Sequence, residues 1–340
     1  MKPRGGKRKF DILTTASDTT TVLDGSYRPD IILQGTGVNQ VYDLGNALLY
    51  NPGTTHFIFY NNTPEFVGVV NSDSTVWHRV PPRARCICAL QSNAAAAGVW
   101  WSEVVESKNP GYGFNGLNDY TGYGTGGAYY AEYGHWVAAT GAGAAIGLNS
   151  GFITASPGRQ GTIAVSTGTT DTGSVRVYNS GQEMNISNGC RAWRGSQALS
   201  ALSVAADEFI IRCGIVDNIA GGAPTNACYF VYDRLTWGDV WTLRNIDAAG
   251  NNTVATAVVP AITPGTNWQL LEMEVSSAGA RSDFWIDRVQ VSPAGGLNTN
   301  MPTGAVNLYY FLGITKSAGL NSRRIEFDYT QIQSYPTVLR

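Results

Sequence analysis

Three β-rich runs stand within residues 209–244, which read FIIRCGIVDNIAGGAPTNACYFVYDRLTWGDVWTLR. The runs cover residues 209–215, 227–233 and 241–244, and most of their residues are the β-branched and aromatic types that strands favour. A polar pair, Asp217-Asn218, follows the first run and marks its end. The stretch therefore predicts successive strands of a β-sheet.

The composition extends this prediction to the whole chain. Of 340 residues, 43% are hydrophobic, only 14% are charged, 40 are glycine and 11% are aromatic. An average globular chain has about 25% charged residues and about 7% glycine. Low charge with many glycines and aromatics excludes a coiled coil, a helical bundle and an acidic disordered tail, and favours short strands joined by tight turns. The length suggests two domains.

Turn signals and changes of composition divide the chain into four segments. Residues 1–9 form a basic arm. Residues 10–106 contain short strand-like runs separated by turn signals such as 51–53 and 61–64, a spacing that predicts a small antiparallel β-sandwich. Residues 107–150 are rich in Gly and Tyr and predict a linker. Residues 151–340 return to the β pattern, in which only 196–206 could form a short helix.

Charge is distributed unevenly. The formal net charge is −2, so no general basic field exists to attract nucleic acid. The arm nevertheless holds five cations and no acid: Lys2, Arg4, Lys7, Arg8 and Lys9. An arm without a core of its own should dock on an acidic patch of another subunit through charge-assisted contacts.

The cysteines and the apolar runs indicate in which cellular compartment the chain is expected. The five cysteines, at 86, 88, 190, 213 and 228, are odd in number and irregularly spaced. Buried free thiols in a reducing compartment explain them best, although a Cys213–Cys228 pair stays open. Cys86 and Cys88 should share one face of a strand, and no further ligands follow at metal-site spacing, so we expect neither metal nor cofactor. The chain has no run of about 18 apolar residues and no apolar region after the basic start, so neither a membrane span nor a signal peptide is expected.

The order of several motifs in residues 150–335 resembles a known family. These motifs are the runs at 209–215, 227–233 and 241–244, followed by 267–275, 284–288, 299–302, 313–316 and 325–329. Together they resemble the concanavalin A-like jelly roll of bacteriophage tail and head appendage proteins. In the order and spacing of their motifs, residues 10–105 resemble a small β-domain that recurs in phage fibres and capsid-attached proteins. The resemblance implies an all-β chain, with a small N-terminal β-sandwich followed by a concanavalin A-like jelly-roll sandwich.

Glu272 and Glu274 are candidate catalytic residues. Two positions apart on a strand, they should face the same way about 7 Å apart, and glycosidases of the jelly-roll fold carry their acid and nucleophile on one strand in this manner. The family pattern has three carboxylates on alternate positions, and here Ser276 replaces the third. We therefore favour a solvent-facing polar row over catalysis. Asp283 and Asp287 should flank a short strand as turn residues rather than bind an ion or a sugar.

The segment 112–136 offers a candidate binding surface. Its Gly122–Gly127 stretch satisfies G-x-G-x-x-G, but no strand precedes it and no helix follows, so a dinucleotide site is not expected. Its rings could stack on sugars, or they could pack between domains or between copies of the chain, which we favour. The residues concerned are Tyr120, Tyr123, Tyr129, Tyr130 and Trp136.

These observations favour a non-enzymatic phage virion protein, a short tail or head fibre assembled in the cytoplasm of the bacterial host and exposed on the virion surface. Its N-terminal part should attach to capsid, portal, neck or tail proteins, and its jelly roll should project and contact host-surface glycan. By family analogy the state should be a homotrimer. The alternatives are a capsid decoration protein and a glycan-degrading, tailspike-like hydrolase.

Overall fold

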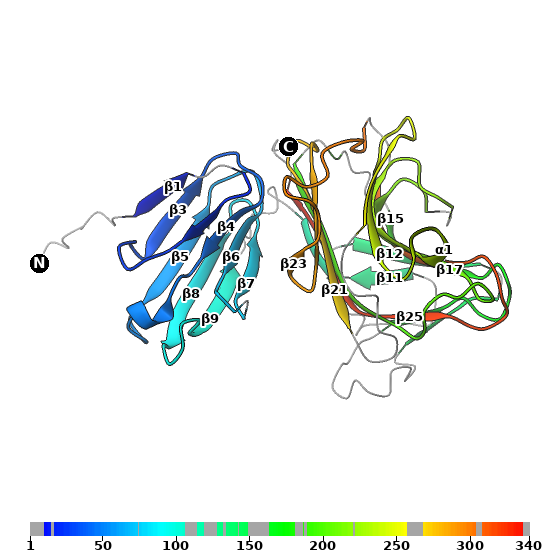
Figure 1. The fold of residues 1–340 in the computed structure, drawn as a ribbon, viewed down its shortest axis with the longest axis horizontal. Helices are drawn as coiled ribbons and strands as arrows, with labels where there is room; N and C mark the ends of the chain where they lie inside the picture. Colours follow the sequence, from blue (N-terminus) through cyan, green and yellow to red (C-terminus); the bar gives the residue numbers. More distant parts are fainter. Residues whose placement is uncertain are drawn as a thin grey trace, which may run out of the picture. The chain divides into compact units, whose positions relative to one another are not determined.

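The computed structural model divides the chain into two compact units, one comprising residues 1–112 and 339–340 and the other residues 113–338 (Figure 1). It describes residues 10–14, 17–73, 75–105, 114–118, 128–131, 134–141, 143–148, 163–180, 186, 189–219, 222–256, 268–303 and 308–335. The unit of residues 1–112 and 339–340 is called the N-terminal unit, and the unit of residues 113–338 is called the C-terminal unit.

The N-terminal unit is a sandwich of a five-stranded and a four-stranded sheet. The order in the five-stranded sheet is β1-β3-β5-β8-β9, and in the four-stranded sheet it is β2-β4-β6-β7. The elements are β1 Asp11–Thr14, β2 Thr20–Val22, β3 Asp30–Gln34, β4 Gln40–Asp43, the 3₁₀ helix Ala47–Leu49, β5 His56–Asn61, β6 Val67–Val70, β7 Trp77–Val80, β8 Arg85–Ser92 and β9 Val99–Val105.

The first six strands alternate between the two sheets, so β2, β3, β4 and β5 each serve as the crossover between two strands of the opposite sheet. As a result, β1, β3 and β5 pair in parallel, and so do β2, β4 and β6. Only β7, β8 and β9 pair antiparallel with their neighbours. The expected antiparallel sandwich is therefore wrong in strand direction, because a turn signal does not say whether the chain folds back into its own sheet or crosses to the other.

Alternating burial places the core of this unit between its sheets. In β5 the side chains of Phe57 and Phe59 are buried while those of Ile58 and Tyr60 are only partly so. The expected turn after β5 is present: the Asn61 carboxamide donates to the carbonyls of Glu65 and Val80, each over 2.8 Å. One face of every strand in the five-stranded sheet thus contributes to the core, and the other is left outside it.

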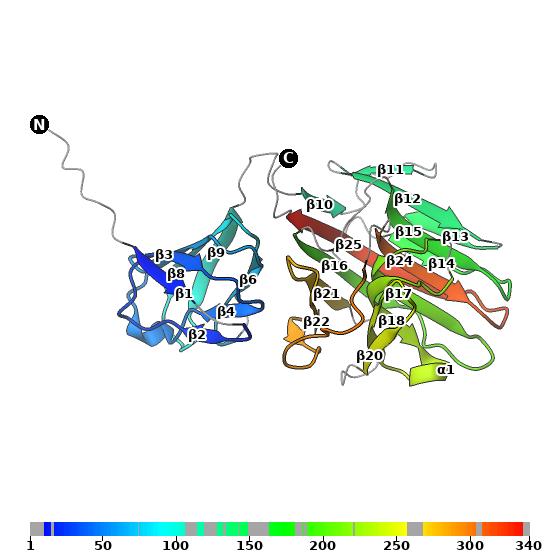
Figure 2. The ribbon, with the colours of Figure 1, turned by 90° about the horizontal axis from the view of Figure 1, so that it is seen from above.

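The C-terminal unit consists of two eight-stranded sheets (Figure 2). The first, named here the β25 sheet, has the order β13-β14-β25-β16-β21-β22-β23, with β10 also paired to β25. The second, the β24 sheet, has the order β11-β12-β15-β24-β17-β18-β19-β20.

Every pair in both sheets is antiparallel. The strands are β10 Phe114–Asn118, β11 Ala128–Ala131, β12 Gly134–Thr140, β13 Ala145–Leu148, β14 Ile163–Ser166, β15 Ser174–Ser180, β16 Cys190–Leu199, β17 Phe209–Val216, β18 Ala227–Asp233, β19 Trp241–Ile246, β20 Asn252–Thr256, β21 Gln269–Val275, β22 Ser282–Ile286, β23 Val289–Gln290, β24 Tyr309–Lys316 and β25 Arg324–Tyr335, and the helix α1 spans Arg234–Trp237.

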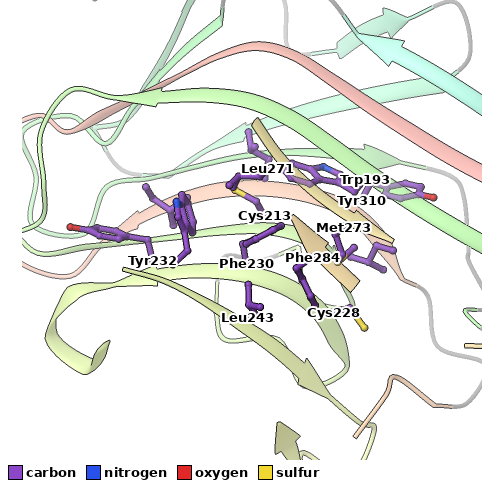
Figure 3. Packing of buried hydrophobic residues seen from close by; sticks show 14 of the residues in the cluster. Trp193, Cys213, Cys228, Phe230, Tyr232, Leu243, Leu271, Met273, Phe284 and Tyr310 are labelled. Atoms are coloured by element: carbon purple, nitrogen blue, oxygen red, sulfur yellow. The ribbon is translucent and has the colours of Figure 1, made fainter. Parts of the chain in front are cut away.

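The core of the C-terminal unit lies between the two sheets. Trp193, Met273 and Phe284 of the β25 sheet and Phe230 of the β24 sheet are fully buried in one cluster (Figure 3). The rings of Phe230 and Phe284 meet edge to face, with centroids 5.0 Å apart. Two antiparallel sheets packed face to face define an all-β sandwich of jelly-roll type, and the expected fold class is confirmed.

Two expected segments differ from the structure. Residues 107–150, expected as a linker, contribute β10, β11, β12 and β13 to the sheets of the C-terminal unit. Residues 196–199 belong to β16 and residues 200–206 are not helical, so the expected helix at 196–206 is absent; an α-helix is found at Arg234–Trp237. In both cases pairing with strands distant in sequence outweighs local composition.

Candidate functional site

Glu272 and Glu274 lie on the face of β21 that points away from the sandwich core. Leu271, Met273 and Val275 alternate with them and are buried in the core cluster. The two carboxylates therefore share one face, as their spacing predicted. They are not exposed, however: the relative accessibility is 4% for Glu272 and 6% for Glu274. The interpretation as a solvent-facing row is wrong on this point, because neighbouring side chains of the same sheet cover both.

A single guanidinium binds both carboxylates. Arg194 on β16 stands opposite Glu272 in the antiparallel register. Its Nε donates to Oε1 of Glu272 over 2.9 Å, and its Nη2 donates to Oε1 of Glu274 over 3.2 Å. Its Nη1 donates to the carboxamide oxygens of Gln331 and Gln333 on β25, at 3.3 and 2.5 Å. Five polar side chains from three adjacent strands thus form one buried network, named here the Arg194 cluster.

A second ion pair extends the polar surface to β22. Asp283 pairs with Glu274 in the register and is 3% exposed. The Arg281 guanidinium binds it with two hydrogen bonds, Nε to Oδ2 over 2.8 Å and Nη2 to Oδ1 over 2.7 Å. Asp283 was expected in a turn, but it is a strand residue. Asp287 does lie in the β22–β23 turn, where both it and Arg288 have positive φ, and burial raises the pKa of its carboxyl.

The Arg194 cluster can be compared with the carboxyl pair of a glycosidase. In such enzymes one carboxyl group must hold a proton for the leaving group while the other stays ionised. Here both carboxylates accept hydrogen bonds from one arginine. Arg194 thus ties the two buried carboxylates to each other and to β25.

The cysteines with described side chains are free. Cys86, Cys88, Cys213 and Cys228 are buried thiols, which resolves the open question of a Cys213–Cys228 disulfide. Cys86 and Cys88 share a face of β8 as expected, with their sulfur atoms 3.7 Å apart. Burial raises the pKa of Cys213 and of Cys228. Inert core thiols account for all four.

Other expected site residues fall outside the described part. The five cations of residues 1–9 belong there, as do Tyr120, Tyr123 and the whole Gly122–Gly127 stretch. The backbones of β11 and β12 pair Tyr129 with Trp136. The side chains of these two residues and of Tyr130 are not among the described ones, so the stacking and packing alternatives stay predictions.

An apolar sheet face in the N-terminal unit was missed by the sequence reasoning. It is the side of the five-stranded sheet that points away from the core, named here the apolar face. It carries large apolar side chains on all five strands, and three of them are strongly exposed: Ile12 at 53%, Val99 at 55% and Trp101 at 46%. The partly buried members are Ile32, Ile58, Tyr60, Ile87, Ala89 and Val105.

Register aligns these side chains into rows that cross the sheet. One row runs from Ile12 through Ile32, Tyr60 and Arg85 to Val105. A shallow depression of about 540 Å³ lies over four of its five members and is also lined by Arg83. The signal was present in the sequence: the strands HFIFYN and RCICALQS are apolar at most outward positions as well as inward ones. A sheet exposed on one side normally alternates apolar with polar.

Comparison with known proteins identifies no family. No family model matches the chain, and no curated protein does. Solved structures similar to it include a protein of unknown function from Shewanella oneidensis MR-1, at 11% identity and TM-score 0.49, covering 69% of this chain and 92% of that one. An endo-1,3-beta-glucanase from Streptomyces sioyaensis follows at 10% identity and TM-score 0.43, covering 68% and 99%. The Emp46p carbohydrate recognition domain in its potassium-bound form has 8% identity and TM-score 0.40, covering 60% and 89%.

These similarities are too distant to assign an activity to this chain. The jelly-roll sandwich is assigned from the strand pairing of the chain itself. Within the described ranges, no group of three or more His, Cys, Asp and Glu side chains is placed to hold a metal ion. In the same ranges no helix is both long and apolar enough to cross a membrane.

Proposed function

We propose that the chain is a non-enzymatic structural protein that attaches through the apolar face of its N-terminal unit and presents its C-terminal jelly roll to host-surface glycan. The protein would attach to a phage virion as a short tail or head appendage. The order of its motifs, which resembles that of phage appendage proteins, suggests this particle. The apolar face is the observation that carries this proposal. Soluble monomers rarely expose large apolar surfaces, and such surfaces mark interaction sites.

The shape of the apolar face suits a protein partner. Ile58 and Ile87 are register partners at its centre, and charged side chains such as Asp30, Arg85 and Glu103 lie among and around the apolar ones. An apolar centre with a polar rim is the ordinary composition of a protein interface. The five cations of residues 1–9 directly precede this unit in sequence and would add contacts to an acidic surface of the same partner.

The Arg194 cluster supports the non-enzymatic part of the proposal. A tailspike-like hydrolase would need a proton on one of two carboxyl groups that here share an arginine. A capsid decoration protein remains the second candidate, because the apolar face would serve attachment to a capsid equally well.

The proposal is tested by particle incorporation. Phage virions are purified on a density gradient from a lysate of bacteria that produce the chain. These virions should contain the wild-type protein. Ile58→Lys places a charge at the centre of the apolar face, so this variant should fold but stay in the soluble fraction. Leu320→Lys is the matched control, because Leu320 is 69% exposed in the C-terminal unit, and this variant should be incorporated normally.

Two results would overturn the proposal: wild-type protein absent from the particles, or normal incorporation of Ile58→Lys. Antibody labelling of intact particles separates the two candidates, since an appendage is labelled at the tail or at discrete head positions and a decoration protein over the whole capsid. Removal of residues 2–9 should reduce incorporation while leaving the thermal unfolding of the protein unchanged.

A further inference from the structure

The depression over the apolar face combines an apolar lining with cationic side chains. Its apolar lining comes from Ile32, Tyr60, Ala84 and Val105, and its volume is about 540 Å³. Cavities of roughly 300–1,000 Å³ with an apolar lining and a few polar groups are typical of binding sites. The depression is therefore large enough to receive a large side chain of a partner protein.

Arg85 lies between two apolar members of the row that crosses this depression. It stands opposite Tyr60 of β5 and opposite Val105 of β9, and adjacent strands lie about 4.8 Å apart. Its side chain is exposed. Within the part of the chain that the structure describes, this side chain forms neither an ion pair nor a hydrogen bond. Its guanidinium is thus available to an anion that arrives beside the apolar lining.

No carboxylate among the described residues lines the depression. The nearest acids on the same face belong to the next row, where Asp30 stands opposite Ile58 and Glu103 stands opposite Ile87. Asp30 accepts a hydrogen bond from the Tyr60 hydroxyl over 3.3 Å. The lining is therefore cationic, and the group complementary to it on a partner is a carboxylate.

The turn before β8 adds a second arginine to the lining. The backbone N–H of Ala84 donates to the carbonyl of Pro81 over 3.2 Å, and that of Arg83 donates to the carbonyl of Asn61 over 2.7 Å. Arg83 has φ +64°, a conformation for which such turns ordinarily use glycine or asparagine. Strain of this kind is often found at binding sites, and here it anchors an exposed arginine beside the depression.

Asn62 completes the polar side of the lining. Its backbone N–H is already used, because it donates to the carbonyl of Leu33 over 3.0 Å. Its side chain is exposed, and no described residue forms a hydrogen bond with it. This carboxamide can therefore donate to a backbone carbonyl of a segment that lies over the depression.

We propose that the depression binds an extended, acidic segment of the attachment partner. One large apolar side chain would pack against Ile32, Tyr60 and Val105, and a carboxylate two residues away would bind Arg85. Side chains at positions i and i+2 of an extended segment point to the same side, about 7 Å apart, so both can reach neighbouring members of the row. This inference rests on the proposed attachment function and names the chemistry of the partner. A purely apolar segment would leave Arg85 without a counter-charge, and a purely acidic one would leave the apolar lining uncovered.

Titration calorimetry with the full chain provides the test. The probe is acetyl-Ser-Phe-Ser-Glu-Ser-amide, named here the acidic peptide. One matched peptide has Gln in place of Glu, and the other has Ala in place of Phe. The wild type should bind the acidic peptide about tenfold or more tightly than either matched peptide, because each of these lacks one of the two contacts. Added NaCl should weaken binding of the acidic peptide.

Three variants test the arginines. Arg85→Gln should weaken binding of the acidic peptide by about tenfold or more, to the level of the Gln peptide. Arg83→Gly should weaken it by about threefold or more without lowering the temperature of unfolding, because glycine adopts a positive φ without strain. Arg288→Gly is the matched control. Arg288 has φ +69° in the C-terminal unit, so this change removes an equal charge and a similar strain and should leave binding unchanged.

Thermal unfolding of each variant checks that the fold is retained. Absence of binding of the acidic peptide, equal binding of the acidic and Gln peptides, or undiminished binding by Arg85→Gln would overturn the inference. Binding of phosphatidylglycerol vesicles in place of the acidic peptide would also overturn it, since the partner would then be a lipid surface. The incorporation of Ile58→Lys into particles is measured independently of these peptides, so a failed peptide site is distinguishable from a failed attachment role.

Discussion

Arg194 on β16 and Glu272 on β21 stand opposite each other in an antiparallel register, and the arginine Nε donates to the carboxylate Oε1 over 2.9 Å. The pair is buried on both sides, at 8% and 4% exposure. The same guanidinium binds Glu274 as well. The two glutamates whose spacing resembles that of a catalytic pair are therefore held by one arginine.

Replacing Arg194 by Met should destabilise the C-terminal unit. Two carboxylates would be left buried without their counter-charge, which costs about 3–5 kcal/mol in comparable buried pairs. Urea unfolding followed by tryptophan fluorescence measures the free energy of unfolding. The triple variant Arg194→Met, Glu272→Leu, Glu274→Leu should recover most of the loss, since an apolar replacement leaves no buried charge. A single variant as stable as the wild type would contradict this account of the cluster.

Replacing both carboxylates by amides should not change any effect of the protein on polysaccharides. If the protein is non-enzymatic as proposed, the viscosity of a capsular polysaccharide solution should not fall with the wild type, nor with the Glu272→Gln, Glu274→Gln variant. A wild-type protein that clears the polysaccharide, with clearing lost in the variant, would establish a hydrolase.

Because of Asp207, the free energy of unfolding should decrease in acid. Hydrogen bonds from the side chain and backbone N–H of Asn321 hold the pKa of Asp207 below its ordinary value, and Arg323 contributes with Nη2 to Oδ2 at 3.0 Å. A depressed folded-state pKa gives stability that is complete above the unfolded-state value of about 4 and is lost as pH falls through the folded-state value. Unfolding free energies of wild type and Asp207→Asn should therefore differ most above pH about 4 and converge below it. A difference independent of pH would refute the linkage.

Two glycines of the N-terminal unit allow a matched comparison. Gly45 and Gly53 have nearly the same positive φ, +76° and +77°, but an added Cβ at Gly45 would lie 2.0 Å from the Leu23 carbonyl oxygen and one at Gly53 would meet nothing within 4 Å. Gly53→Ala should cost about 1 kcal/mol from the left-handed backbone alone. Gly45→Ala should cost about 2–4 kcal/mol, since the backbone must also shift. Equal losses in chemical denaturation would show that the close approach is unimportant.

The four described thiols should be unreactive in the native protein. In a Cys190→Ser variant at pH 8, a chromogenic disulfide reagent should detect almost no thiol until guanidinium is added, and then four, because burial blocks access and raises the pKa of Cys213 and Cys228. Only two thiols after denaturation would indicate a disulfide.

Local features of the sequence were sufficient for the strands and for the direction of their side chains. Because side chains alternate along a strand, the spacing of Glu272 and Glu274 placed both on one face, and that of Cys86 and Cys88 did the same. The turn at Asn61 and the buried thiols were predicted from residue type. The apolar face could also have been found, since the outward positions of β5 and β8 include Ile58, Tyr60, Ile87 and Ala89 in the printed sequence.

Tertiary structure alone decided which strands are neighbours. Arg194 lies 78 residues before Glu272, and the chain between them gives no local sign that their strands pair in this register. The same holds for the parallel pairing of β1, β3 and β5, and for the entry of β10, β11, β12 and β13 into the jelly roll. The physical reason is that alternation within a strand is set by its own backbone, whereas register and partner are set by the summed packing of two distant faces. The carboxylates could thus be assigned to a face from the sequence, but the arginine that binds both could be seen only in the folded chain.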